Sequence, residues 1–96
     1  VVELHVGAYC DLVREGRQGD ARGALNALRA SAAHATRLGL EVHAGHGIDF
    51  ETIAPVAAIP EIAEFNIGHF LIGEAIFIGL EAAVTRMRRL MDEARA

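Results

Sequence analysis

The chain has 96 residues, enough for one domain at most, and its 52% hydrophobic and 23% charged residues exclude a disordered chain. All nine basic residues are Arg, the net charge is −4 with neutral histidines, and no basic stripe with interleaved aromatic residues suggests nucleic-acid binding. Cys10 is the single cysteine, so no disulfide can form within the chain. The longest apolar stretch, 70–84, contains two glutamates and is shorter than the about 20 residues that span a bilayer. We therefore expect a cytoplasmic protein.

The first half of the chain predicts a strand followed by a long helix. Alternating polar and apolar residues predict a strand over 1–6, after which a loop or a frayed helical turn is expected through Gly19. Apolar residues three and four positions apart then predict an amphipathic helix over 20–38. Asp20 is expected to be its N-cap and Gly39 its C-cap.

The second half predicts further strands that alternate with helices. These elements are a strand over 40–44, a short helix within 50–59 that ends at Pro60, a strand over 63–67, a short apolar helix over 70–77 and an amphipathic helix over 80–94. Leu80, Val84, Met87, Leu90, Met91 and Ala94 form one apolar stripe on the last helix, which predicts that both methionines lie in the core. His34 lies opposite the apolar stripe of its own helix and is expected to be exposed.

Each predicted strand carries the same pattern of glutamate, an apolar residue, histidine or asparagine, an apolar residue and glycine. The copies are residues 3–7, 41–45 and 64–68. Because side chains alternate along a strand, each copy puts Glu, His or Asn, and Gly on one face and two apolar residues on the other. Charged residues on a buried strand face are costly unless they are paired or used, so this polar face indicates an active site.

Repeated strand–helix units imply parallel strands, and polar strand faces suit the lumen of a barrel. We therefore predict an α/β fold that consists of the last three βα units of a (β/α)8 TIM barrel with outer helices. Residues 1–96 are expected to be the C-terminal, incomplete part of a single barrel domain. An open doubly wound sheet is the alternative, but its strands normally bury apolar residues on both faces.

Two glycine–histidine corners follow the second and third predicted strands. In (β/α)8 barrels the catalytic groups lie at the C-terminal strand ends, and loops after the last two strands commonly hold phosphate. Gly45-His46-Gly47 follows one strand, and Gly68-His69 opens a short helix whose free N–H groups suit an anion. Glycine lets the backbone approach a phosphate closely and histidine adds a donor, so these corners predict phosphate binding.

His46 and Glu3 are the candidates for acid–base chemistry. Imidazole titrates near neutral pH and a loop position gives His46 access to a substrate, although a loop histidine that caps a carbonyl is the alternative. Glu3 faces the same lumen, where it has either a catalytic role or a structural ion pair. His5, His43 and Asn66 hold equivalent places in the three copies and are expected to form a hydrogen-bonded layer.

The remaining polar residues of the repeat have two interpretations, a structural role and a metal site. Glu41 and Glu64 lie lowest on their strands and are expected to be structural. His43-x-x-His46 with His5 and His69 nearby is a possible set of zinc ligands. Its spacing fits poorly, because His43 lies within a strand and His46 follows a glycine.

Three motifs in this order resemble the pyridoxine 5'-phosphate synthase family of the deoxyxylulose-dependent vitamin B6 pathway. They are Ala44-Gly45-His46-Gly47, Ala57-Ala58-Ile59-Pro60-Glu61 and Asn66-Ile67-Gly68-His69, and the similarity extends over 2–9 and 79–96. The resemblance implies a (β/α)8 barrel that joins 1-deoxy-D-xylulose 5-phosphate to 3-amino-2-oxopropyl phosphate, giving pyridoxine 5'-phosphate, phosphate and water without a cofactor. It also implies self-association, with octamers as in similar members.

By position in the motifs, the resemblance implies that His46 is the proton donor and that Glu3 stabilises a transition state. It implies that Gly47, Gly68 and His69 bind the phosphate of the aminoketone. The family's other acid–base residues and its deoxyxylulose phosphate contacts belong to earlier strands. The chain differs from the family's usual pattern at His43 and Val6, where Asn and Thr are usual, and over Glu15 to Gly23, which is longer and richer in glycine.

The alternatives to an enzyme fragment are a phosphate-binding module without catalysis and a metal-binding or purely structural half-barrel.

Overall fold

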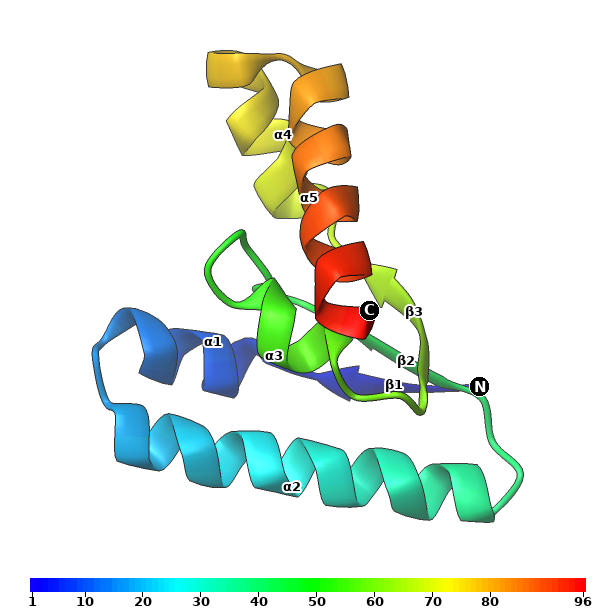
Figure 1. The fold of residues 1–96 in the computed structure, drawn as a ribbon. Helices are drawn as coiled ribbons and strands as arrows, with labels where there is room; N and C mark the ends of the chain where they lie inside the picture. The colour runs from blue at the N-terminus through cyan, green and yellow to red at the C-terminus, as the bar shows by residue number, and fades with distance from the viewer.

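The computed structural model describes the backbone of residues 1–96 and every side chain except that of His69. Strands and helices alternate along the chain, with helices α1 and α2 in succession after the first strand and α4 and α5 at the end (Figure 1). The elements are β1 (Val2–His5), α1 (Gly7–Arg14), α2 (Gln18–Arg37), β2 (Val42–Gly45), α3 (Ile53–Ala57), β3 (Ile62–Asn66), α4 (Gly68–Ile78) and α5 (Leu80–Arg95).

The three strands form one parallel sheet in the order β1-β2-β3, with β2 in the middle. Figure 1 shows α2 lying along the sheet and the α4–α5 hairpin extending away from it. This arrangement confirms the predicted α/β class and its parallel βα units, as three successive units of a (β/α)8 barrel. Because parallel strands share their direction, their C-terminal ends meet at one edge of the sheet.

The strands separate an apolar face from a polar face, as the repeat predicts. On β1, Val2 and Leu4 pack against the core while Glu3 and His5 are exposed. The fully buried side chains come from β2, α3, β3 and the segments next to the strands and α3; they include Val6, Val42, Ile48, Ile53, Val56, Ile59 and Ile62. Burial of these apolar side chains supplies the main driving force for folding.

The segment after β1 differs from its prediction, because residues 7–14 form helix α1 and not a loop or frayed turn. The helix begins directly after the strand, with the Cys10 backbone N–H donating to the Val6 carbonyl over 3.0 Å. Tyr9 and Cys10 on this helix are buried in the core. Tertiary burial therefore stabilises a helix that is only eight residues long and begins with glycine.

Helix α2 begins at Gln18, two residues before its predicted start. The prediction that Asp20 caps this helix is wrong: no side-chain cap hydrogen bond is present among the described residues, and Asp20 lies in the first turn in an ion pair with Arg17. The end of the helix is as predicted. Gly39 has φ +81° and follows the last turn in a Schellman motif, in which the N–H of Leu40 donates to the Ala35 carbonyl over 3.1 Å.

The last two helices agree with prediction in position but not in the full extent of their packing. Met87 on α5 is 3% exposed and Met91 is partly buried, whereas Leu80 and Val84 are 58% and 47% exposed. The predicted stripe therefore packs only in its C-terminal part, because the start of α5 belongs to the hairpin that projects from the sheet. Over the residues that the structure describes, we find no helix with the length and apolar character needed to cross a membrane.

Candidate active site at the carboxyl ends of β2 and β3

A cavity of about 570 Å³ opens at the C-terminal ends of β2 and β3. Its walls are the loop after β2, the junction between β3 and α4, and Arg14 from α1. Three residues predicted for the site, His46, Gly47 and Gly68, line it together. The size lies within the range of about 300–1,000 Å³ typical of pockets for small ligands.

Helix α4 opens at this cavity. It begins at Gly68, and no side-chain cap hydrogen bond from a described residue occupies its first N–H groups. An uncapped helix N-terminus carries partial positive charge and free donors, which suit a phosphate. The side chain of His69, predicted as part of the same phosphate site, lies outside the described part of the chain.

The His46–Gly47 corner has an uncommon backbone conformation, with φ +75° at His46 and +88° at Gly47. The imidazole of His46 stacks on that of His5, with ring centroids 4.5 Å apart. Glycine at position 7 makes this possible, because a Cβ there would lie 3.1 Å from the His46 ring. The corner is thus pressed against the start of α1.

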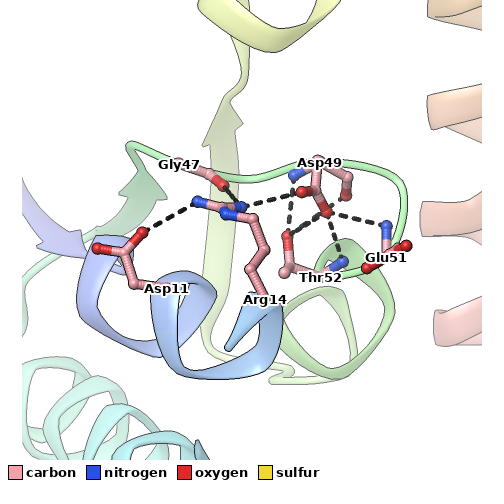
Figure 2. A network of polar contacts seen from close by, with 6 residues as sticks. All are labelled: Asp11, Arg14, Gly47, Asp49, Glu51 and Thr52. Carbon is pink, nitrogen blue, oxygen red and sulfur yellow. Dashed lines mark hydrogen bonds and ion pairs between the residues drawn. The ribbon is translucent and has the colours of Figure 1, made fainter. Parts of the chain in front are cut away.

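Arg14 of α1 contacts the backbone of the corner (Figure 2). Its Nη1 donates to the Gly47 carbonyl over 3.1 Å and to the Asp49 carboxylate over 2.9 Å, and its Nη2 pairs with Asp11 over 3.3 Å. Burial by itself lowers the pKa of Arg14, but the hydrogen bonds and charges of Asp49 and Asp11 outweigh it and raise this pKa above its ordinary value. A permanent positive charge therefore lies at the cavity wall.

Asp49 is itself fixed by a turn that leads into α3 (Figure 2). Its Oδ1 accepts hydrogen bonds from the backbone N–H groups of Glu51 and Thr52, both over 2.9 Å, and the Asp49 N–H donates to the Thr52 hydroxyl oxygen over 2.8 Å. This reciprocal pair has the form of a capping box. Neither Arg14 nor Asp49 is predicted from the sequence, although Asp-x-x-Thr before an apolar run is the signal that points to Asp49.

Glu3 is connected to the cavity wall by a hydrogen bond with Asn66. The Asn66 side-chain amide donates to Glu3 Oε1 over 3.0 Å, across the middle strand at Gly45. A Cβ on Gly45 would lie 2.6 Å from Glu3 Oε1 and 3.1 Å from Asn66 Cβ, so only glycine leaves room for this bond. Asn66 lines the cavity, whereas Glu3 lies one step behind it.

The predicted layer of His5, His43 and Asn66 is wrong. The strands are staggered by two residues, so His5 and Asn66 share a level with Gly45, while His43 lies level with Glu3 and Glu64. The stagger arises from strand pairing, which equal spacing within each copy of the repeat does not determine.

His43 lies between two carboxylates. Its Nε2 is 2.6 Å from Glu41 and its Nδ1 is 3.1 Å from Glu64, which gives both glutamates the structural role expected of them. Both ring nitrogens of His43 are therefore occupied, and the His46 ring stacks on His5 instead of approaching His43. Among the described residues, which do not include the side chain of His69, no group of metal-ligating side chains suited to a metal ion is present.

The sequence of the chain matches one family over nearly its whole length. The family profile described as "Pyridoxal phosphate biosynthesis protein PdxJ" matches residues 1–93. The chain is 66% identical over 95 residues to pyridoxine 5'-phosphate synthase of Caulobacter vibrioides, 64% over 95 residues to that of Cereibacter sphaeroides and 62% over 96 residues to that of Ruegeria pomeroyi.

These alignments cover 99%, 99% and 100% of this chain but only 37%, 38% and 39% of the relatives, so the chain spans less than half the length of the curated proteins it matches. The profile match and the identities agree with the motifs that form the cavity. The chain belongs to the PdxJ family of pyridoxal phosphate biosynthesis proteins.

Proposed function

We propose that the complete protein containing this chain is a pyridoxine 5'-phosphate synthase. In this reaction 1-deoxy-D-xylulose 5-phosphate and 3-amino-2-oxopropyl phosphate condense to pyridoxine 5'-phosphate, with release of phosphate and water. The observation that carries the proposal is the cavity that His46, Gly47 and Gly68 line together at the strand ends. The names of the most similar relatives support the same activity.

The phosphate of the aminoketone is proposed to bind between Gly47, Gly68 and His69. Support comes from the uncapped start of α4 at Gly68, where helix N–H groups are free, and from the place of Gly47 in the wall of the same cavity.

His46 is proposed to donate the proton that ring closure requires. Loss of water needs an acid that protonates the departing hydroxyl group, and an imidazolium N–H in the cavity suits this step. Glu3 is proposed to stabilise the charge that develops, helped by the Asn66 amide that orients its carboxylate. The remaining acid–base groups of the reaction are expected from other strands of the barrel.

The proposal also covers the domain organisation, localisation and oligomeric state of the complete protein. Residues 1–96 form the C-terminal part of one barrel domain, and the complete protein is a cytoplasmic homo-oligomer, octameric by analogy with its family. Its partners are small phosphorylated substrates and copies of itself.

The test is an assay of the complete protein for pyridoxine 5'-phosphate from the two substrates, repeated with His46→Ala and with His34→Ala as a matched control. His34 is an exposed histidine of α2 and contacts no part of the cavity. We expect His46→Ala to lower kcat by roughly 10²- to 10⁴-fold and His34→Ala to leave it unchanged. Phosphate binding without turnover by the unaltered protein would instead identify a non-catalytic binding module, and full activity of His46→Ala would remove His46 from the mechanism.

A further inference from the structure

The His46–Gly47 corner requires something that holds it in place. A residue other than glycine at φ +75° costs free energy and persists only where the surroundings fix it. The stacked ring of His5 restrains the His46 side chain, but it does not restrain the peptide groups of the corner. A restraint on the peptide groups has to come from a hydrogen bond to the backbone of the corner.

Arg14 is the side chain that contacts this backbone. Its Nη1 donates at once to the Gly47 carbonyl and to the Asp49 carboxylate, at 3.1 and 2.9 Å. Asp49 is a rigid partner because its own carboxylate is fixed by the backbone N–H groups of the turn and by the buried Thr52. The planar guanidinium thus joins the corner to the start of α3 in one fixed geometry.

Arg14 is poorly placed to be a phosphate ligand itself. Both N–H groups of Nη1 are used by protein acceptors, and Nη2 pairs with Asp11 over 3.3 Å. Two carboxylates, Asp11 and Asp49, already match its charge. These contacts favour a role in which Arg14 holds the backbone of the His46–Gly47 corner in place.

We infer that Arg14 is a positioning residue: supported by Asp49, it fixes the Gly47 carbonyl and thereby the orientation in which the corner presents His46 to the cavity. This inference rests on the proposed function, in which His46 donates a proton. It assigns Arg14 no contact with substrate.

The first test compares Arg14→Ala with Arg17→Ala in the complete protein. Arg17 is the matched control because it also pairs with an aspartate three residues away but contacts no part of the corner. We expect Arg14→Ala to lower kcat by roughly ten- to a hundredfold with little change in KM, and Arg17→Ala to change kcat by less than about twofold. Equal activity of the two variants, or a rise in KM for either substrate at unchanged kcat, would overturn the inference.

A double variant separates positioning from a general loss of stability. Asparagine tolerates positive φ, so His46→Asn removes the acid while the corner keeps its backbone. If Arg14 acts through His46, adding Arg14→Ala to His46→Asn lowers kcat by no more than about a further twofold. A loss as large as in the single variant would mean that Arg14 acts independently, which contradicts the inference.

A crystal structure of the Arg14→Ala protein tests the inference without activity. We expect the Gly47 carbonyl to turn away and the left-handed conformation at His46 to be lost, whereas an unchanged corner would overturn the inference. This measurement also decides the matter if the unaltered protein shows no turnover, a result that would refute the proposed function alone. If Arg14→Ala does not fold, Asp49→Asn is the second variant, because it keeps the size of the side chain and removes the charge that pairs with Arg14. It should lower kcat by more than Arg17→Ala does, and activity equal to that of Arg17→Ala would overturn the inference.

Discussion

The two histidines of β2 and its following loop, His43 and His46, lie in opposite kinds of environment. His43 is 16% exposed, with a carboxylate at each ring nitrogen, whereas His46 is exposed, stacks on another imidazole and faces the cavity. The same residue type therefore has different surroundings at two positions along a short stretch of chain. An imidazole with a carboxylate at each nitrogen is fixed in place, while one that faces a cavity can reach a ligand bound there.

The corner that carries His46 also covers the core, and the reactivity of Cys10 can be used to measure how closely the corner packs. A Cβ at Gly47 would lie 3.6 Å from Cys10 Cβ, and Cys10 is fully buried, so its side chain packs against the corner. Burial raises the pKa of the Cys10 thiol, although Thr52 and Arg14 act in the opposite direction, so the reactive thiolate is scarcer at neutral pH than in an exposed cysteine. We expect labelling of Cys10 at pH 7 to be at least roughly a hundredfold slower in the folded than in the unfolded protein.

Mass spectrometry of the peptide that contains Cys10 measures this rate. The rate should increase as the pH rises above the ordinary range of a thiol, because the thiolate forms only there. Arg14→Ala should accelerate labelling by opening the corner, and Arg17→Ala should not. Rapid labelling of the unaltered folded protein would contradict close packing of the corner over the core.

A second prediction concerns the bond between Glu3 and Asn66. Gly45→Ala places a methyl group where the Glu3 carboxylate lies, so the carboxylate has to move and its bond to the Asn66 amide is lost. We expect kcat of the complete protein to fall roughly tenfold, since the developing charge loses an oriented partner. The free energy of unfolding should fall by about 1 kcal/mol through overpacking.

Gly73→Ala is the control for this change, because a Cβ at that position in α4 meets no atom within 4 Å. It should leave kcat unchanged and stabilise the protein by up to about 1 kcal/mol, since alanine is the better helix former. Enzyme kinetics and urea unfolding measure both quantities. Equal kcat for the two alanine variants would show that Glu3 does not depend on Gly45 for its position.

The smallest effect on kcat and stability is expected from changes around His43, near the start of β2. Glu41→Gln combined with Glu64→Gln removes both charges that face His43 but keeps groups of similar size. Both glutamates are more than half exposed, so the loss of stability should be about 1 kcal/mol or less and kcat should stay within about twofold. A larger fall in kcat than Gly45→Ala causes would place the chemistry at His43 and reverse the comparison.

The sequence predicts most of the fold, because strands and long helices leave periodic patterns. The strand bounds agree with the structure to within two residues, and Gly39 ends α2 as expected. Helix α1 is not predictable in this way, since its stability comes from burial of Tyr9 and Cys10 against distant residues. Local periodicity carries no information about such contacts.

The site is predictable to a similar extent. His46, Gly47 and Gly68 follow from the rule that barrel chemistry lies at the strand ends, and the cavity brings them together. The role of Arg14 escapes prediction because Gly47 and Asp49 lie 33 and 35 residues away and contact it only once α1 has folded against the loop. The stagger of the strands, which separates His43 from His5, is likewise a property of pairing and not of the repeat.

The most direct test of the difference between the two histidines makes the same substitution at both positions. His46→Asn and His43→Asn each replace an imidazole by an amide that tolerates the local backbone. In the complete protein, kcat for pyridoxine 5'-phosphate formation should fall by roughly 10²- to 10⁴-fold for His46→Asn and change little for His43→Asn. Equal losses at the two positions, or a greater loss for His43→Asn, would contradict the assignment of proton transfer to His46.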